Sequence, residues 1–369
     1  MEISFDRQKL LDSFTMASAV ASSKSPNPVL QKYVRFRALQ EKASIAATDL
    51  EMSLEVSVPD VETLRPGECL LPIAEMGRIL HENTDATMKL DCAGNVLNVI
   101  GKNRYQIPIP AVEDYVDVAL ADLQVTHETS AKSLAELGRL TVFATDMESA
   151  RYAMSGVLLE MHGQRFLGVA TDGRRLAKVE IDARAVDASV PDVQTALVPR
   201  RGMDLLIRLL GGRDEELSIG WAGNMFGADG QDFRFRTNQV EGKFPNWRDA
   251  VERIKPGAQV EMVTEVALAA VRQAAIVCDN ESPGLTFHLA DGTLSVSATT
   301  QRGEANVTLP VSYNGAAVEV ILDYRYVTDF LRVLDPLSVF SLDMSGPDRA
   351  VVFRAGERYM YVLMPMARR

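Results

Sequence analysis

The feature that most constrains the fold of this chain is an internal repetition whose period is about one third of its length. A short motif occurs three times, the last time in a weaker form: Ala47-Thr48-Asp49, Ala170-Thr171-Asp172 and Ala298-Thr299-Thr300. After each copy, apolar residues first alternate and then recur at helical spacing, in segments that begin at Leu71, Val198 and Leu322. Strand and helix patterns that succeed each other at nearly constant spacing indicate a triplicated unit rather than a chance likeness.

Each repeat also opens in the same way, with a short strand pattern followed directly by a helix pattern. The three opening helix patterns cover residues 6–22, 130–145 and 264–279. Asp-Gly pairs between strand patterns favour tight hairpins and therefore antiparallel pairing; they stand at residues 172–173, 229–230 and 291–292. The sequence thus predicts an α+β fold of three repeated domains, each with two helices packed on antiparallel sheet.

We place the domain boundaries near residues 121 and 252, which gives domains of residues 1–121, 122–252 and 253–369. Neither boundary is rich in glycine or serine, so we expect short linkers and a rigid arrangement. A chain of 369 residues is too long for one ordinary core. Its 47% hydrophobic and 24% charged residues are typical of folded globular proteins.

The amino-terminal residues contain no apolar core of a secretory signal, and no stretch approaches the roughly 20 apolar residues that cross a bilayer. The cysteines Cys69, Cys92 and Cys278 show no C-x-x-C spacing. We therefore expect neither a disulfide framework nor a zinc site. Together these features predict a protein of the reducing cytoplasm with no membrane partner.

The net charge of −11 excludes a protein whose whole surface is basic, which would be the simplest nucleic-acid-binding design. Net charge sums over all surfaces, whereas binding depends on the one surface that faces the DNA. The repeat helices carry several basic residues against the acidic whole, among them Arg78, Arg200 and Arg201. The sequence therefore allows a basic strip on an acidic body, although a solvated helix face explains any single one of these residues equally well.

A search for catalytic patterns finds no site. The histidines His81, His127, His162 and His288 lack metal-ligand spacing, and the chain has no phosphate-binding loop, dinucleotide fingerprint or nucleophile elbow. Asp172 could act as a catalytic carboxylate, but its place in an Asp-Gly pair is explained by a hairpin turn. We expect no enzymatic activity, no cofactor and no metal.

Three segments carry a resemblance to a known family: VATDGRRLA at residues 169–177, VEGKFPNW at 240–247 and YVLMPMARR at 361–369. They resemble the beta subunit of bacterial DNA polymerase III, the sliding clamp, and the resemblance extends over the whole chain. It implies that two chains join head to tail into a ring that encircles duplex DNA, with helices lining the hole and sheets outside. It also implies a tether for the replicative polymerase and other replication and repair proteins, without catalysis.

Domain size supports two chains rather than one. A domain of about 123 residues has a radius of gyration of roughly 14 Å, so three domains leave a hole too narrow for a duplex, whereas six leave a hole of roughly 35 Å.

The resemblance further implies a pocket that receives the tails of the clamp loader and the polymerase. The matching positions are Met154, Thr171, Gly173, Arg174, Arg175, Leu176, Pro245, Ala250, Val362, Leu363, Met364, Pro365 and Met366. Methionine and leucine give an adaptable apolar wall that suits several partners, and Arg174 and Arg175 can hold backbone carbonyls or acidic flanks of a peptide. Arg174, Asp249 and the tail 367–369 depart from the family pattern, which affects peptide preference rather than the pocket.

Two further sets of residues follow from the resemblance. Lys24 and Tyr152 match positions that contact DNA, and we group with them Arg78, Arg200 and Arg201 of the repeat helices. Glu148 stands among the DNA-facing positions, where the family commonly has an uncharged polar residue, so phosphate contact is expected to be weaker. The matched ring-closing edges carry Tyr105 and Ile107 on the first domain, and Ile276, Val277 and Glu304 on the third.

Two other functions stay open at the level of sequence. A monomeric three-repeat scaffold that binds protein tails without encircling DNA keeps the fold and the pocket, and it suits the net charge of −11. An enzyme, for example one that processes nucleotides, is a more distant alternative because no catalytic site supports it. The sedimentation mass of the native protein separates the ring from the scaffold.

Overall fold

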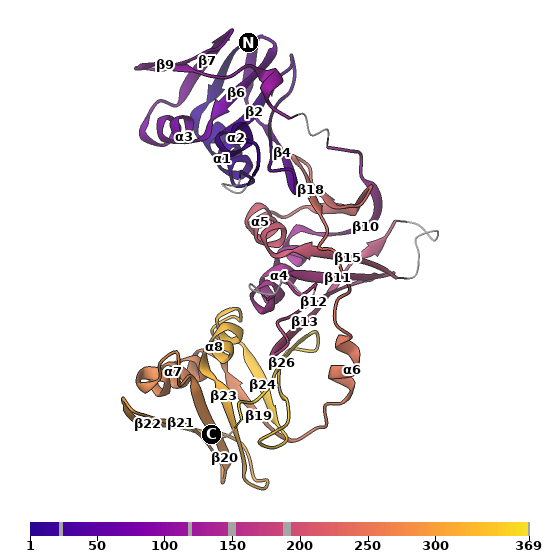
Figure 1. The fold of residues 1–369 in the computed structure, drawn as a ribbon, viewed down its shortest axis with the longest axis vertical. Helices are drawn as coiled ribbons and strands as arrows, with labels where there is room; N and C mark the ends of the chain where they lie inside the picture. Colours follow the sequence, from indigo (N-terminus) through magenta and orange to yellow (C-terminus); the bar gives the residue numbers. More distant parts are fainter. Residues whose placement is uncertain (22–24, 117–119, 147–152, 187–192, 368–369) are drawn as a thin grey trace. The chain divides into compact units, whose positions relative to one another are not determined.

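The structure is a computed structural model that describes residues 1–21, 25–116, 120–146, 153–186 and 193–367. Figure 1 shows its helices and strands, and the contacts within the chain divide it into two compact units. Unit 1 comprises residues 1–132, 184–190 and 208–239, and unit 2 comprises residues 133–183, 191–207 and 240–369. None of the helices in the described part of the chain combines the length and the apolar character that crossing a bilayer requires.

Unit 1 contains two antiparallel sheets and the helices of the first repeat. Its five-stranded sheet has the order β5 (Val61–Arg65), β1 (Glu2–Asp6), β7 (Thr87–Ala93), β8 (Val96–Ile100) and β9 (Arg104–Pro108). Its nine-stranded sheet has the order β14 (Arg184–Ala185), β10 (Gln124–Ser130), β16 (Glu216–Ala222), β17 (Met225–Asp229), β18 (Phe233–Asn238), β4 (Met52–Val58), β3 (Ala43–Thr48), β2 (Tyr33–Ala38) and β6 (Gly67–Pro72). The helices are α1 (Arg7–Ser18), α2 (Pro28–Lys32), α3 (Ile73–Glu82) and the 3-10 helix η1 (Val112–Asp114).

Unit 2 also contains two antiparallel sheets. The eight-stranded sheet has the order β15 (Gln194–Pro199), β11 (Gly156–His162), β12 (Arg165–Thr171), β13 (Arg175–Asp182), β26 (Tyr359–Leu363), β25 (Val351–Ala355), β24 (Val339–Met344) and β19 (Ala258–Val263). The four-stranded sheet has the order β22 (Gly303–Pro310), β21 (Thr293–Thr300), β20 (Gly284–Ala290) and β23 (Val318–Asp323). The helices wholly in unit 2 are α6 (Trp247–Glu252), α7 (Thr264–Ala274), α8 (Tyr324–Arg332) and the 3-10 helices η2 (Val142–Ala144) and η3 (Ala275–Val277). The limits of the units fall within α4 (Ala131–Thr141) and α5 (Arg200–Leu210).

The same strand order occurs three times, which confirms the predicted triplication. One four-stranded pattern appears as β1-β7-β8-β9, β10-β16-β17-β18 and β19-β24-β25-β26. The other appears as β4-β3-β2-β6, β13-β12-β11-β15 and β22-β21-β20-β23. Every repeat thus consists of two antiparallel four-stranded patterns with helices in matching places, the α+β fold that the sequence predicted.

The predicted helices and turns agree with the structure to within a few residues. The opening helix patterns correspond to α1, α4 and α7, and the second helix patterns correspond to α3, α5 and α8. Asp6 and Asp323 accept hydrogen bonds from the backbone nitrogens of Lys9 and Arg325, so they cap the first turns of α1 and α8. All three Asp-Gly pairs lie where one strand turns into the next, between β12 and β13, β17 and β18, and β20 and β21.

The paired helices of each repeat pack closely. α1 contacts α3, and α7 contacts α8, which lies beside it in Figure 1. In the middle repeat, a Cβ atom at Gly138 would lie 2.8 Å from the side chains of Met203 and Ile207. The absence of a side chain at Gly138 therefore allows α4 and α5 to approach each other.

Continuous hydrogen-bonded sheet crosses the repeat boundaries. β18 of the middle repeat pairs with β4 of the first repeat inside unit 1, and β13 of the middle repeat pairs with β26 of the third inside unit 2. The sequence predicted three separate domains, whereas the contacts between residues group the chain into two compact units. The reason is that these two ladders join each half of the middle repeat to a different neighbour.

Candidate functional site

The β12–β13 hairpin of unit 2 turns through Thr171, Asp172 and Gly173, and the first two of these belong to the motif that the sequence repeats. One carboxylate oxygen of Asp172 accepts hydrogen bonds from the backbone nitrogens of Arg174 and Arg175 at 2.9 and 3.0 Å. The Thr171 hydroxyl donates to the Arg175 carbonyl at 2.6 Å and accepts from the Gly173 nitrogen at 3.1 Å. Gly173 has a φ of 83°, in the left-handed region that glycine adopts without steric penalty. The turn itself therefore accounts for Asp172.

A cavity of about 200 Å³ opens beside this turn, and we call it the apolar pocket. Its lining residues are Met154, Thr171, Gly173, Arg174, Arg175, Leu176, Pro245, Asn246, Trp247, Ala250, Val251, Val362 and Met364. Leu176 and Val362 are cross-strand partners in the β13–β26 ladder, so they present adjacent apolar side chains to the pocket. Met364 is 50% exposed, which leaves a flexible apolar side chain at the rim.

The structure brings most of the predicted pocket residues together and places three of them elsewhere. Leu363 is fully buried, because neighbouring side chains on β26 point to opposite faces and Val362 takes the pocket side. Pro365 and Met366 line an adjoining cavity of about 490 Å³, which shares Arg174 and Met364 with the apolar pocket. The carboxyl-terminal segment thus borders two cavities rather than one.

Sequence reasoning missed three lining residues: Asn246, Trp247 and Val251. They belong to α6 and to the residue before it, on the segment that connects β18 to β19 (Figure 1). Trp247 is 7% exposed and packs in one apolar cluster with Leu176 and Val362. A tryptophan directly after a Phe-Pro-Asn sequence is the signal that could have found this wall, since so large a side chain is seldom left uncovered in a short connection.

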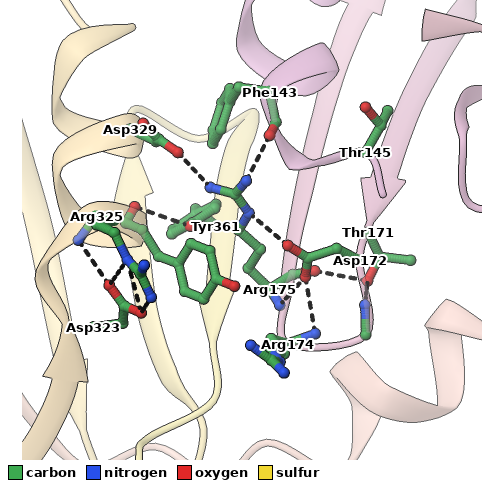
Figure 2. Close-up of polar contacts among 12 residues, drawn as sticks. Phe143, Thr145, Thr171, Asp172, Arg174, Arg175, Asp323, Arg325, Asp329 and Tyr361 are labelled. Atoms are coloured by element: carbon green, nitrogen blue, oxygen red, sulfur yellow. Dashed lines mark hydrogen bonds and ion pairs between the residues drawn. The ribbon is translucent and has the colours of Figure 1, made fainter. Parts of the chain in front are cut away.

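Arg175 lines the apolar pocket, and its guanidinium group donates hydrogen bonds to residues of unit 2. It donates to Asp172 at 2.9 Å, to Asp329 of α8 at 2.7 Å and to the Phe143 carbonyl at 2.7 Å, as Figure 2 shows. Burial alone would lower the pKa of Arg175, but Tyr361, Asp329 and Asp172 outweigh it and raise that pKa.

The sequence suggested that Arg175 can hold a peptide. In the structure, its guanidinium group is hydrogen-bonded to Asp172, to η2 and to α8. The cause is burial: only 9% of the side chain is exposed, and a buried cation needs fixed partners.

Arg174 has a different environment from its neighbour. Its side chain is exposed and lines both the apolar pocket and the adjoining cavity. A hydrogen bond with Tyr326 of α8 raises the pKa of Arg174 above its ordinary value. Of the two arginines, Arg174 is the one whose exposure allows contact with a ligand that occupies both cavities.

The chain matches two family models, which together span more than half of it. Residues 1–119 match the amino-terminal domain of the DNA polymerase III beta subunit, and residues 128–246 match its central domain. The chain belongs to this family. Its function is therefore that of a DNA sliding clamp, a processivity factor for DNA polymerase.

Three known clamps illustrate the relationship. The beta sliding clamp of Escherichia coli K12 is 26% identical over 371 residues, which cover 99% of this chain and 100% of that protein. A crystal structure of a sliding clamp from Pseudomonas aeruginosa bound to griselimycin is 26% identical, covers 100% of both chains and has a TM-score of 0.89. A clamp structure from Bacillus subtilis, 17% identical, has a TM-score of 0.91 over 100% of both chains and shares the fold.

The residues of this clamp that we predicted to face DNA are placed only in part. Lys24, Glu148 and Tyr152 lie outside the described residues. Arg78 is exposed on α3, and its side chain lies 3.9 Å from Glu75. Arg200 at the start of α5 donates to the Thr145 hydroxyl at 3.1 Å, and Arg201 follows it on the same helix.

Other basic residues of the clamp helices are held by their own unit. Lys9 forms an ion pair with Asp60, Arg139 donates to the carbonyl of Val333, and Arg325 binds Asp323 at 2.6 Å. The carboxylates of Asp60 and Asp323 offset the charges of Lys9 and Arg325, so these two residues offer less positive charge to a phosphate backbone.

The predicted ring-closing residues of this clamp lie at the ends of two sheets. Tyr105 and Ile107 are on β9, the last strand of the five-stranded sheet, and their side chains are half-buried. Glu304 is exposed on β22, the last strand of the four-stranded sheet, and Ile276 of η3 is 73% exposed. Val277 follows Ile276, and its carbonyl accepts the Thr300 hydroxyl at 2.5 Å, which fixes η3 against β21.

The described residues contain no group of three or more histidine, cysteine, aspartate or glutamate residues that could hold a metal ion. Cys69, Cys92 and Cys278 are free and buried.

Proposed function

We propose that this clamp closes as a head-to-tail homodimer around duplex DNA without sequence preference, and that the apolar pocket receives the tails of the clamp loader, the replicative polymerase and other replication proteins. The chain acts in this proposal as a tether without a catalytic step. It works in the cytoplasm, without a membrane partner. The domain boundaries near residues 121 and 252 remain part of the proposal, supported by the strand order that repeats in each third.

The observation that carries the partner site is the apolar pocket itself. It combines an apolar floor, Leu176 and Val362, with a half-exposed Met364 at the rim and the exposed Arg174 beside it. A concave apolar surface with a few polar groups at its edge is the usual form of a site that anchors one or two side chains of a peptide. We extend the proposal to griselimycin, which the Pseudomonas aeruginosa clamp binds, and place its site on this chain in the apolar pocket.

Substitution of Leu176 by Asp, or deletion of residues 364–369, tests the pocket. A carboxylate in the apolar floor should weaken the binding of griselimycin and of a synthetic polymerase-tail peptide by about 30-fold or more, because a central contact is worth about 2 kcal/mol. Titration calorimetry measures the affinity, and analytical ultracentrifugation checks that the dimer persists. Unchanged affinity in both variants would refute the pocket assignment.

Ring closure is supported by two strands that end their sheets, β9 and β22. An edge strand presents unpaired backbone donors and acceptors, so β9 of one protomer can pair with β22 of its partner. The half-buried Tyr105 and Ile107 and the exposed Ile276 supply apolar surface at these edges. Because the two edges differ, the contact is head to tail, and it closes after two copies if the rotation allows.

The matched variant for ring closure is Ile276→Asp, combined with Tyr105→Asp. It should sediment as a monomer and still bind griselimycin, whereas Leu176→Asp should sediment as a dimer and fail to bind it. Each variant would then lose one property, dimer formation or griselimycin binding, and keep the other. A dimer that survives both edge substitutions would contradict the proposed interface.

DNA retention tests encirclement. With a net charge of −11, affinity for linear duplex should be weak and should fall steeply with salt. A ring loaded on a nicked circular plasmid should resist the same salt, because release requires an interface to open, and it should leave once the plasmid is cut. Equal release from circular and linear DNA would refute the ring.

The monomeric scaffold is favoured by one observation, the internal pairing of Lys9 and Arg325 on the clamp helices. It predicts a native sedimentation mass equal to one chain and the same peptide binding. A dimer mass at micromolar concentration, together with retention on circular DNA, would exclude it.

A further inference from the structure

Glu160 is a buried carboxylate that does not line the apolar pocket but contacts the helix that does. It lies on β11, and its side chain is 5% exposed. One carboxylate oxygen accepts from the Trp247 indole nitrogen at 3.2 Å and from one Arg248 nitrogen at 3.1 Å. The other accepts from the second terminal nitrogen of Arg248, and the His162 ring nitrogen lies 3.5 Å from it. The first two residues of α6 thus share one acceptor group.

The position of α6 depends on the contacts of its side chains. It contains six residues, and Asn246 at its amino terminus makes no side-chain capping hydrogen bond. A helix this short is not stable in isolation, so its geometry depends on the contacts that its side chains make. Those contacts include the burial of Trp247 in the apolar cluster, the packing of Val251 against that cluster and the hydrogen bonds to Glu160.

Two cationic side chains, Arg248 and Lys178, lie over the indole ring of Trp247. The Arg248 guanidinium carbon lies 4.4 Å from the centre of the Trp247 ring, and the Lys178 ammonium nitrogen lies 5.7 Å from it. Because Glu160 holds both the indole nitrogen and the stacked guanidinium, it sets the position and the tilt of the Trp247 ring. Burial alone would raise the pKa of Glu160, but the hydrogen bonds from Arg248 and Trp247 outweigh burial and lower it, so the carboxylate stays charged.

The position of α6 matters for the pocket because α6 forms one wall of it. Trp247, Ala250 and Val251 all line the cavity, and Pro245 precedes them. A shift of the helix would move several lining side chains at once, and contact with a ligand in a cavity of about 200 Å³ is sensitive to such a shift.

We infer that Glu160 is a positioning residue for partner binding, which acts through Trp247 and Arg248 to hold the α6 wall of the apolar pocket in its binding geometry. This inference rests on the proposed assignment of the pocket. Glu160 is not among the residues that line the pocket, so its effect on affinity is separable from the effect of a lining residue.

The test uses the full-length protein with Trp221→Phe, which leaves Trp247 as the single tryptophan. Glu160→Leu removes both acceptor oxygens, Glu160→Gln keeps one acceptor oxygen for the indole, and Glu180→Gln is the matched control. Glu180 lies on β13, two strands from Glu160, and forms its ion pair with Arg165 at 2.9 Å, whereas Glu160 forms its ion pair with Arg248. Griselimycin is the probe for binding, and the emission of Trp247 reports the environment of the wall.

Glu160→Leu should weaken griselimycin binding by about tenfold, because hydrogen bonds between charged groups are lost. The emission of the ligand-free protein should shift to the red as Trp247 becomes more exposed. Glu160→Gln should restore most of the affinity and of the emission, and Glu180→Gln should match the parent in both. The unfolding midpoint of each variant, followed by circular dichroism, identifies any general loss of stability.

Parental affinity and emission in Glu160→Leu would overturn the inference. Equal losses in Glu160→Gln and Glu160→Leu that scale with a lowered unfolding midpoint would assign Glu160 to general stability and overturn it as well. If the parent itself fails to bind griselimycin, the pocket assignment fails, and with it the binding role of Glu160. In that case an emission shift in Glu160→Leu would still separate the two failures.

Discussion

The two junctions at which the middle repeat joins its neighbours have the same backbone conformation and carry different side chains. At the β4–β18 junction of unit 1, Asp49 accepts from the backbone nitrogens two and three residues later at 3.1 and 2.9 Å, and Asp172 does the same at the β13–β26 junction of unit 2. The positive φ of 77° at Leu50 matches the 83° of Gly173. Both turns lead directly into the strand that crosses the repeat boundary.

The junctions diverge at the second cross-strand pair after the turn. This pair is Leu176 with Val362 at the β13–β26 junction and Ser53 with Arg236 at the β4–β18 junction. Arg236 is 1% exposed and binds Asp229 with two hydrogen bonds, one of them at 3.0 Å. An apolar pair therefore borders a pocket at one junction, and a buried ion pair occupies the corresponding place at the other. The repeated backbone supplies the same frame at both junctions, and the side chains on it differ.

The largest expected effect comes from removing the arginine of each junction. Arg175→Met and Arg236→Met should each lower the free energy of unfolding by about 3 kcal/mol, because each leaves a carboxylate that was paired with a buried guanidinium. Only Arg175→Met should also weaken griselimycin binding, since Arg175 supports the turn and lines the pocket. Urea unfolding and titration calorimetry measure the two quantities. Equal weakening of binding by Arg236→Met would break the comparison.

An effect of intermediate size on the free energy of unfolding is expected when the pH is lowered. The folded pKa of Glu160 lies below its ordinary value of 4.5, owing to Arg248 and Trp247, which overcome the opposing effect of burial. The folded state therefore favours the charged form, and the stabilisation is complete above about pH 4.5 and is lost as pH falls through the folded pKa. Glu160→Gln should cost about 1 kcal/mol at neutral pH, a value reduced because Arg248 is 47% exposed.

The free energy of unfolding, measured at acid pH, tests this prediction. Glu160→Gln should flatten the decline of the unfolding free energy below pH 4.5 relative to Glu180→Gln, measured in urea at several pH values. Since Glu160, Arg248, His162 and Lys178 all lie in unit 2, the change should concern the unfolding of unit 2, which the emission of Trp247 reports. A parallel decline in both variants would contradict it.

The smallest effect is expected from exchanging the residues with positive φ. Leu50→Gly should stabilise the protein by about 0.5 kcal/mol, because relief of the left-handed strain exceeds the entropy that glycine loses on folding. Gly173→Ala should destabilise by about 1 kcal/mol through the backbone alone, since no atom lies within 4 Å of an added Cβ. Thermal unfolding checks both. Destabilisation by Leu50→Gly would mean that the side chain, although 43% exposed, contributes more than its strain removes.

The amino-acid sequence by itself determined the repeats, the helices and the turns. These are local properties: apolar spacing distinguishes α8 from β13, and an Asp-Gly pair selects a hairpin whatever lies around it. The motif resemblance also located most of the apolar pocket, including Leu176, Val362 and Met364.

Only the tertiary structure decided which of those side chains are available. Arg175 and Asp329 are separated by 154 residues, and Trp247 and Glu160 by 87, so no local pattern indicates that they meet. Burial then makes the difference between Arg175, whose guanidinium is held by internal partners, and the exposed Arg174 next to it. The physical reason is that hydrogen-bonded ladders such as β13–β26 bring distant segments together, and the burial that results obliges each charged group to find a fixed partner.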